Sequence, residues 1–220
     1  MNQNLDLNRP LIVIGAGGHA RVLISTLLLQ GQQILGFVDP HKIGADLLGL
    51  TQLGSDDAVL TYDPSEVFLV NGVGSAASIS KRLKAYEYFR TEGYSFASVI
   101  HPGSIVAPEA RLADGVQVMA GAIVQTGCVI EEDVIINTGA RVDHDCVLRM
   151  HAHVAPGAVL GGNVSVGHRA HVGAGAVVIQ NIRIGDDAIV GAGAVVLADV
   201  PVSSTVVGVP ARPIHAKLRD

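Results

Sequence analysis

The sequence predicts two domains, a small Rossmann-like α/β domain with a parallel sheet and, after it, a parallel β-helix made of three-sided coils. Three observations support this fold class. Aliphatic residues recur every six positions in the second half of the chain, small or aliphatic residues fill the position four residues later, and strand and helix patterns alternate before residue 100. We expect the α/β domain at 1–100, the β-helix at 101–200, and a C-terminal cap and tail at 201–220.

The aliphatic repeat is unbroken over fifteen positions. A period of six suits neither an amphipathic helix nor a half-buried strand, but it suits short flat strands joined by turns. If each coil contains three hexads, each hexad lies directly above the one three hexads earlier in the sequence. The fifteen hexads then make five coils. We expect the hexads to begin at Ile105 and to slip by one residue near Arg111. The repeated positions are Leu112, Val118, Val124, Ile130, Ile136, Val142, Leu148, Val154, Leu160, Val166, Val172, Val178, Ile184, Val190 and Val196.

The N-terminal region alternates between strand and helix patterns. A short buried run and a glycine turn precede a helical pattern, which is typical of a β-turn-α unit. Such alternation predicts a small parallel sheet whose ligand lies beyond the carboxyl ends of the strands. The expected strands are 10–14, 34–38 and 67–70, and the expected helices are 19–30 and 76–91.

Charge and hydropathy argue against two classes of partner. The net charge is -5 and the basic residues form no run, so we expect no nucleic-acid partner. Residues 1–10 lack the apolar core of a signal sequence, and residues 23–29 are too short and too interrupted by Ser and Thr to span a bilayer. We therefore expect a cytoplasmic protein that does not bind membranes.

The two cysteines, Cys128 and Cys146, are separated by the length of one coil and should face inward at the same corner of adjacent coils. Free cysteines are often buried as small apolar residues, and we expect this packing role here. A redox or nucleophilic role is the alternative.

A candidate catalytic cluster consists of Asp143, His144 and Asp145, which follow an inward aliphatic position in a turn. A carboxylate beside an imidazole can fix its tautomer and stabilise the imidazolium, as a general base near neutral pH requires. The alternative is a solvated turn histidine with charged neighbours, and periodicity does not distinguish the two.

A candidate phosphate loop lies between the first strand and the first helix. Residues 15–20 read Gly-Ala-Gly-Gly-His-Ala, and glycines at a helix N-terminus allow an anion to approach unpaired N–H groups. Asp39, at the end of the second strand, could bind a ribose hydroxyl. The alternative is that these glycines only make a tight turn.

These motifs, taken together with the hexads, carry a resemblance over nearly the whole chain. The chain resembles the bacterial nucleotide-sugar acetyltransferases typified by the bacillosamine-pathway N-acetyltransferase, and sialic-acid O-acetyltransferases are also similar. The motifs are residues 14–19 (Ile-Gly-Ala-Gly-Gly-His), Asp39, 136–145 (Ile-Asn-Thr-Gly-Ala-Arg-Val-Asp-His-Asp), 153–157 (His-Val-Ala-Pro-Gly), 161–163 (Gly-Gly-Asn) and 208–212 (Gly-Val-Pro-Ala-Arg).

The resemblance implies a homotrimer of left-handed β-helices that transfers acetyl from acetyl-CoA to the 4-amino group of a nucleotide-linked sugar. His144 would be the general base, and Asp145 would orient it. The family usually carries Glu at this flanking position, so Asp143 is an alternative partner. Asn137 would lie close to the reacting groups, and the backbone N–H of Gly162 would stabilise the oxyanion.

The resemblance also implies two sets of binding residues. Acetyl-CoA would lie in the cleft between neighbouring helices, and the amine would attack it directly, without an acyl-enzyme. The residues expected at the nucleotide-sugar are Gly17, Gly18, His19, Asp39, Gly74 and Ser75. The residues expected at acetyl-CoA are His153, Gly162, Gly175, Ala192 and Arg212.

A metal site is the rival interpretation of the histidines. His153 and His171 are also separated by the length of one coil and should stack on neighbouring coils. The trimeric hexapeptide-repeat carbonic anhydrases bind zinc with a histidine pair five residues apart, and this chain contains no such pair. We therefore expect no metal.

Two other functions are weighed against amine acetylation. One is O-acetylation of a sialic acid or another sugar, and the other is a non-catalytic trimeric scaffold that binds a nucleotide-sugar. An NAD-linked role is weaker, because the chain offers no separate substrate domain. The nucleotide base and the stereochemistry at C4 stay open. UDP-4-amino-4,6-dideoxy-N-acetylglucosamine, a precursor of surface sugars, is favoured because the resemblance is closest there.

Overall fold

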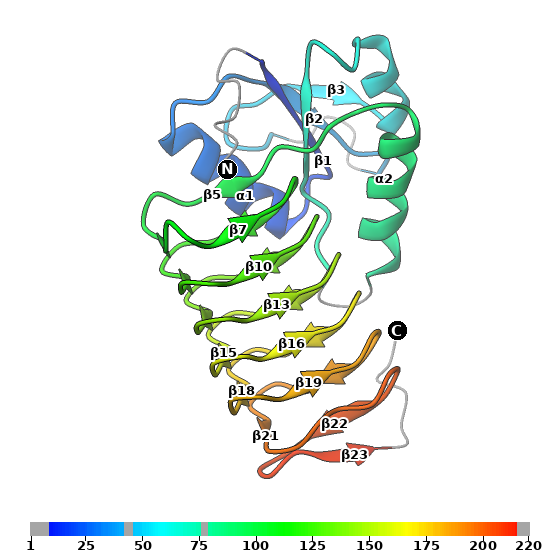
Figure 1. Cartoon of the computed structure of the whole chain (residues 1–220). Coiled ribbons are helices and arrows are strands. Elements are labelled where there is room, and N and C mark those ends of the chain that lie inside the picture. Colours follow the sequence, from blue (N-terminus) through cyan, green and yellow to red (C-terminus); the bar gives the residue numbers. More distant parts are fainter. Residues whose placement is uncertain (1–8, 42–45, 76–78, 215–220) are drawn as a thin grey trace. The chain divides into compact units, whose positions relative to one another are not determined.

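The computed structural model describes residues 9–41, 46–75 and 79–214 of the chain. These residues form two compact units that divide between Val99 and Ile100. Figure 1 shows the order of the elements, and each unit is described by itself.

The first unit contains a four-stranded parallel sheet in the order β3-β2-β1-β4. The two inner strands are almost entirely apolar, and β1 is buried along its whole length. The predicted small parallel sheet is confirmed, and all four strands end at the same edge of it. The strands are β1 (Leu11–Ile14), β2 (Ile34–Val38), β3 (Gln52–Gly54) and β4 (Phe68–Asn71).

Two helices and one 3-10 helix complete this unit. Helix α1 (Gly18–Leu29) buries Ala20, Leu23, Ile24 and Leu27 at helical spacing, and α2 (Ser80–Thr91) buries Tyr86 and Phe89. The expected helix at 76–91 therefore corresponds to α2, and residues 76–78 lie outside the described residues. The sequence pattern did not predict β3 or the 3-10 helix η1 (Asp56–Thr61).

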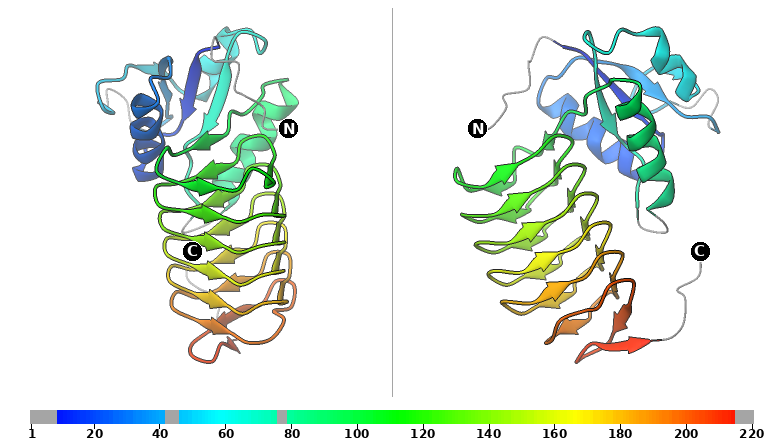
Figure 2. Two further views of the ribbon diagram at one scale, coloured as in Figure 1. Left: turned by 60° about the vertical axis from the view of Figure 1, so that its left-hand side comes forward. Right: turned by 45° about the vertical axis from the view of Figure 1, so that its right-hand side comes forward.

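The second unit is a left-handed parallel β-helix whose coils are visible edge-on in Figure 2. Its strands form three sheets, and the chain visits them in the order I, II, III. Sheet I contains β5 (Val99–Ile100), β8 (Gln117–Val118), β11 (Ile135–Ile136), β14 (His153–Val154), β17 (His171–Val172), β20 (Ile189–Val190), β22 (Thr205–Val207) and β23 (Arg212–Ile214). Sheet II contains β6 (Ile105–Val106), β9 (Ile123–Val124), β12 (Arg141–Val142), β15 (Val159–Leu160), β18 (Val177–Val178) and β21 (Val195–Val196). Sheet III contains β7 (Arg111–Leu112), β10 (Val129–Ile130), β13 (Val147–Leu148), β16 (Ser165–Val166) and β19 (Arg183–Ile184).

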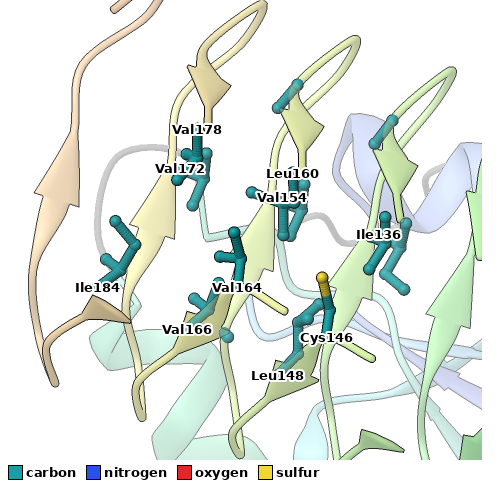
Figure 3. Close-up of a cluster of buried hydrophobic side chains, with 14 of the residues drawn as sticks. Ile136, Cys146, Leu148, Val154, Leu160, Val164, Val166, Val172, Val178 and Ile184 are labelled. Atoms are coloured by element: carbon teal, nitrogen blue, oxygen red, sulfur yellow. The ribbon is translucent and has the colours of Figure 1, made fainter. Parts of the chain in front are cut away.

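The hexad residues form the core of this β-helix, as predicted. Each one is the second residue of its two-residue strand and points inward, and every third hexad is paired, as Ile136, Val154 and Val172 are. Figure 3 shows these aliphatic side chains stacked in the interior. The residue four positions later is also buried in every coil, so the narrow interior is filled with Val, Ile, Leu, Ala and Cys.

The expected start of the repeat at Ile105 is wrong. Val106 packs against the core and lies one hexad before Leu112, while Ile105 faces outward and is 65% exposed. The repeat therefore does not slip near Arg111. Both residues of β6 are aliphatic, so the sequence alone did not identify which of them points inward.

A third repeated position lies in the corners, three residues after each inward aliphatic residue. Fourteen consecutive positions at this spacing have a positive φ, between 55° and 73°. Seven are glycine, which adopts this left-handed conformation without strain, and the other seven are larger residues. The fourteen positions are Gly115, Gly121, Gly127, Asp133, Gly139, Asp145, His151, Gly157, Asn163, Arg169, Gly175, Asn181, Asp187 and Gly193.

Six of the seven larger left-handed residues pair with one another between adjacent coils. Their hydrogen bonds stabilise corners whose backbone disfavours most side chains. The pairs are Asp133 with His151 at 3.0 Å, Asn163 with Asn181 at 2.9 Å, and Arg169 with Asp187 at 2.6 and 2.7 Å. Asp145 is the seventh.

The C-terminal end of the β-helix departs from this period. The pairing of β22 with β20 sets Ile189 opposite Thr205, so the last coil is shorter than the others. β23 runs antiparallel to β22 at the end of sheet I. The antiparallel strand occupies the edge to which another parallel strand would otherwise add. Among the described residues, no helix is both long and apolar enough to cross a membrane.

We expect Leu148→Ala to destabilise the protein by about 2–5 kcal/mol, because the Leu148 side chain is fully buried and the rigid coils cannot collapse around the cavity. Leu197→Ala is the matched control, since Leu197 is 51% exposed and its loss should change the stability by less than about 0.5 kcal/mol. Denaturant unfolding measures both, and equal effects would contradict this account of the core.

Candidate active site

His144 lies in the corner that joins sheet II to sheet III, directly after β12. Its Nδ1 is 2.9 Å from Oδ2 of Asp145. Because the carboxylate accepts a hydrogen bond, it favours the tautomer with the proton on Nδ1. Nε2 then carries a lone pair and has no partner in the described part of the chain. Both side chains are more than half exposed.

The two neighbouring aspartates have different contacts. Asp145 bonds the imidazole, whereas Oδ1 of Asp143 accepts the backbone N–H of His144 at 2.8 Å. The hydrogen bond that His144 donates to Asp145 raises the pKa of His144 above its ordinary value, and the charge of Asp143 adds to the effect. The pair is thus built to take up a proton at Nε2.

Two glycines of the adjacent coils make room for this pair. A Cβ on Gly162, the residue stacked on His144 in the next coil, would lie 2.5 Å from Cε1 and Nε2 of the imidazole. A Cβ on Gly127, which occupies the position of Asp145 in the preceding coil, would collide with its carboxylate. The imidazole therefore packs on the backbone of Gly162, whose own N–H donates no hydrogen bond within the described ranges.

A second group of predicted residues lies where the strands of sheet I lead into the corner that joins sheet I to sheet II. Nδ2 of Asn137 is 3.1 Å from Nε2 of His153, and the rings of His153 and His171 meet edge to face with centroids 4.8 Å apart. Burial lowers the pKa of His171, so this ring is neutral at physiological pH. The predicted stacking of His153 and His171 on neighbouring coils is observed.

Two of the residues expected at acetyl-CoA, Gly175 and Ala192, lie in the equivalent corners of later coils. Gly175 has a left-handed backbone, and a Cβ there would meet nothing within 4 Å. Ala192 occupies the same corner one coil farther on and is exposed, and Arg212 is exposed in β23. His153, Gly175 and Ala192 therefore lie on consecutive coils along one edge, which advance by about 4.8 Å per coil.

The predicted catalytic residues do not form one cluster within a single chain. Asn137 lies in the corner before sheet II, beside His153 of sheet I, and His144 with Gly162 lies in the corner after sheet II. The strand β12 separates Asn137 from His144 in the same coil. A site that uses both corners needs a second copy of the chain.

The first unit contains a pocket of about 560 Å³ at the carboxyl ends of its strands. Gly17, Asp39 and Gly74 line it, as predicted for the nucleotide-sugar. Asp39 holds the loop after β1, since its two carboxylate oxygens accept the N–H groups of Ala16 and His41, both at 2.8 Å.

The other residues predicted for this pocket do not line it. Gly18 is exposed in the first turn of α1, and Ser75 is buried beyond the turn that contains Gly74. His19 is packed beside Gly74, where an added Cβ would lie 3.6 Å from the His19 Cβ. A Cβ on Gly17 or Gly18 would meet nothing within 4 Å, so the fold itself does not require glycine there.

Polar residues that line this pocket were missed from the sequence, and besides His41, which follows Asp39 by two residues, there are four of them. Three are Lys81, Lys84 and Tyr88 of α2, and the fourth is Asp56 at the start of η1. The signal for the first three was the i, i+3, i+7 spacing, which places them on one helix face. Asp56 had no such signal, because η1 itself was not predicted.

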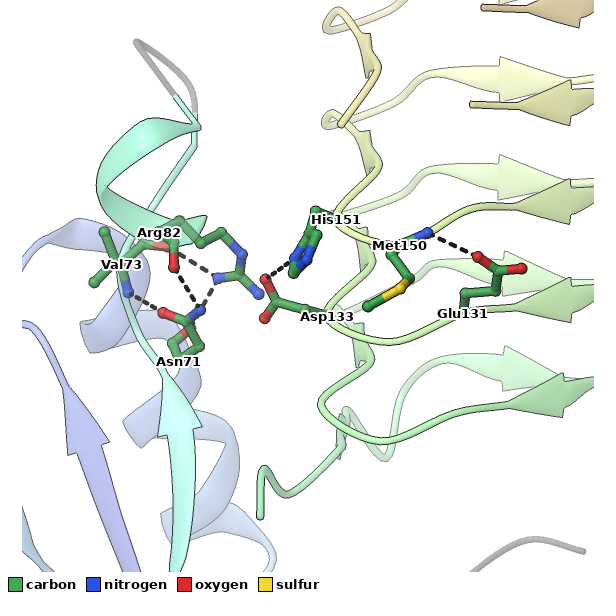
Figure 4. A network of polar contacts seen from close by, with 7 residues as sticks. All are labelled: Asn71, Val73, Arg82, Glu131, Asp133, Met150 and His151. Atoms are coloured by element: carbon green, nitrogen blue, oxygen red, sulfur yellow. Dashed lines mark hydrogen bonds and ion pairs between the residues drawn. The ribbon is translucent and has the colours of Figure 1, made fainter. Parts of the chain in front are cut away.

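Figure 4 shows polar contacts within each unit. In the first unit, Nη1 of Arg82 donates to the carbonyls of Asn71 and Val73, both at 2.9 Å, so α2 holds the turn that contributes Gly74 to the pocket. In the β-helix, Glu131 accepts the backbone N–H of Met150 at 3.0 Å and thereby links adjacent coils.

Both cysteines have the predicted inward orientation and are fully buried. The Cys128 thiol donates to the carbonyl of Asp143 at 3.0 Å, and the Cys146 thiol donates to that of Gly161 at 3.2 Å. Both thiols therefore belong to the packing beneath the His144 corner. Across the described ranges, His, Cys, Asp and Glu side chains form no group of three that could hold a metal ion.

Comparisons with known proteins agree with this architecture. Residues 10–89 match the family model of the PglD N-terminal domain. The acetyltransferase domain of PglB from Neisseria gonorrhoeae FA1090 is 36% identical, with a TM-score of 0.88 over 94% of this chain and 100% of that chain. A related structure of that domain is a complex with acetyl coenzyme A. No curated protein sequence matches the chain.

Two further structures extend the similarity. A histidine-to-alanine mutant of GDP-perosamine N-acetyl transferase from Caulobacter crescentus, in complex with CoA and GDP-perosamine, is 38% identical, with a TM-score of 0.88 over 94% of this chain and 97% of that one. WeeI from Acinetobacter baumannii AYE is 26% identical, with a TM-score of 0.85 over 94% of this chain and 100% of that one. The chain therefore belongs to the nucleotide-sugar N-acetyltransferases of the left-handed β-helix family and is an acetyltransferase.

Proposed function

We propose that this protein transfers the acetyl group of acetyl-CoA to the 4-amino group of a nucleotide-linked 4-amino-4,6-dideoxy sugar, with His144 as the general base. The observation that carries the proposal is the His144–Asp145 pair, whose Nε2 lies beside the backbone of Gly162. UDP-4-amino-4,6-dideoxy-N-acetylglucosamine is the substrate that the sequence resemblance favours.

The reaction proceeds by direct attack. The sugar nitrogen forms a bond to the thioester carbonyl carbon, and negative charge develops on the carbonyl oxygen, where the N–H of Gly162 would stabilise it. His144 Nε2 takes the proton that the nitrogen loses, while Asp145 stabilises the imidazolium. The carbon–sulfur bond then breaks, and the departing thiolate takes the proton from His144. No acyl-enzyme forms, which agrees with the burial of both cysteines.

A homotrimer would bring the two corners of neighbouring chains together. The first residue of each strand in sheet II faces outward, and these residues form a column that is apolar apart from one arginine. Two of them, Ile105 and Val177, are 65% and 37% exposed. Exposed apolar columns of this kind are typical of subunit contacts. The column consists of Ile105, Ile123, Arg141, Val159, Val177 and Val195.

The two substrates would occupy the regions already described. An extended pantetheine arm would follow the edge marked by Gly175 and Ala192, with Arg212 toward the phosphates and His153 near the thioester. The nucleotide would bind in the pocket of the first unit, where the N-terminus of α1 favours an anion and Lys81 and Lys84 add positive charge.

The test is to mix the protein with acetyl-CoA and nucleotide-linked 4-amino-4,6-dideoxy sugars and to measure the release of CoA thiol. We expect turnover with the amino sugar, and a loss of about 10²- to 10⁴-fold in His144→Ala because the general base is removed. Near wild-type turnover by a folded His144→Ala variant would show that His144 is not the general base. Activity with sialic acid in place of the amino sugar would instead identify an O-acetyltransferase.

Asp145→Asn should move the acidic limb of the kcat/KM profile to lower pH. His144 acts as a base only when neutral, and Asp145 raises its pKa above the ordinary value of about 6.5, so removing the negative charge lowers that pKa again. Asn also tolerates the left-handed backbone at this position. Asp143→Asn is the control and should shift the limb less, because Asp143 bonds the backbone. An unchanged limb in Asp145→Asn would show that Asp145 does not tune His144.

Light scattering should give a mass three times that of the 22.8 kDa chain. We expect Val177→Glu to lower this mass and the activity together, because it places a charge in the apolar column of sheet II without entering the core. Ser165→Glu, on the outward face of sheet III, should preserve both. A trimer that survives Val177→Glu unchanged would place the subunit contact elsewhere.

A further inference from the structure

Asp56 lines the pocket of the first unit and has one carboxylate oxygen that lacks a hydrogen-bond partner in the described part of the chain. It is the first residue of η1, directly after β3 and Ser55, and it lines the pocket together with Gly15, Asp39 and Gly74. Its Oδ1 is shielded from solvent and has no hydrogen-bond partner among the described residues. An acceptor buried without a donor is costly, so this oxygen is suited to a donor that a ligand brings.

The order of the strands indicates which part of a nucleotide reaches Asp56. The sheet order is β3-β2-β1, so three loops follow one another along its edge. The glycine loop follows β1 and suits the diphosphate, Asp39 follows β2 and suits the ribose, and Asp56 follows β3. Neighbouring strands are about 4.8 Å apart, a step comparable with the size of one ribose ring. The base therefore falls at β3.

The charges around Asp56 restrict its possible partners. Both carboxylate oxygens of Asp39 already accept backbone N–H groups, from Ala16 and His41. Burial raises the pKa of Asp56, and the negative charges of Asp39 and Asp57 raise it further, while His41 opposes them. A hydrogen bond from a ligand would relieve this unfavourable environment.

We propose that Asp56 is a specificity-determining residue that accepts a hydrogen bond from the lactam N–H of the nucleobase. This inference rests on the proposed function, since it assumes that the pocket binds a nucleotide-sugar. Guanine offers such a donor at N1, and uracil and thymine offer one at N3. Cytosine and adenine have a bare acceptor nitrogen at the equivalent position, which would face the Asp56 oxygen without a proton between them.

The experiment is calorimetric titration of the protein with UDP, CDP, GDP and ADP. UDP and CDP are matched in size and differ at the N3 edge, and GDP and ADP form the corresponding purine pair. We expect UDP to bind at least about tenfold more tightly than CDP, GDP to bind at least about tenfold more tightly than ADP, and Asp56→Asn to reduce both ratios toward one. The tighter of UDP and GDP identifies the base.

Asp57→Asn is the matched control, because Asp57 is exposed next to Asp56 and does not line the pocket. It should leave both ratios unchanged, and thermal unfolding of each variant checks that the fold is retained. If Asp56→Asn weakens the binding of all four nucleotides equally, or weakens none, the inference about Asp56 is overturned and the proposed function is not. If the wild-type protein binds none of the four, the nucleotide-sugar part of the proposed function fails with it.

Discussion

The β-helix depends on a left-handed backbone residue at each of fourteen consecutive corners. At these corners the chain turns from one flat strand into the next through one residue with a positive φ. Glycine meets this requirement in half of the corners. Elsewhere the conformation disfavours a side chain by roughly 1–2 kcal/mol per residue, and hydrogen bonds between adjacent coils offset part of that cost.

Asp145 is the one larger left-handed residue whose side chain does not bond to the equivalent residue of an adjacent coil. The other six larger left-handed residues bond to one another between coils, whereas Asp145 bonds to the adjacent His144. The residue before Asp145 in the stack is Gly127, which offers no side chain to pair with. The carboxylate is therefore left to act on the imidazole, and the corner geometry aims it there.

The fold was predictable because the repeat constrains many residues at once. One aliphatic position in six indicated the coils, the pairing between successive coils and the burial of both cysteines. The start of the repeat was misjudged because Ile105 and Val106 are both aliphatic and only one faces inward. The left-handed positions in the corners were harder to recognise, since half of them are not glycine and one of them is Arg169.

The candidate site was predictable only in part. Sequence motifs mark some of its residues, whereas others are brought together only by the folded structure. The sequence places His144 between two aspartates, but only the folded corner shows that Asp145 contacts the ring and Asp143 the backbone. Asp56 follows a strand, β3, that is too short to leave a pattern. Which residues share a corner of the coil also depends on the three-sided geometry, and this is why Asn137 and His144 are separated despite being close in sequence.

The two glycines beside the His144–Asp145 pair limit how the length of the β-helix can vary. Gly127 and Gly162 belong to the coils on either side of the pair, so the surroundings of the pair occupy three successive coils. Farther along, whole coils can be gained or lost with little effect on this environment. Loss of the coil that contributes Gly162 would place Gln180 over the imidazole, so a change in the length of the rod leaves the pair undisturbed only outside these three coils.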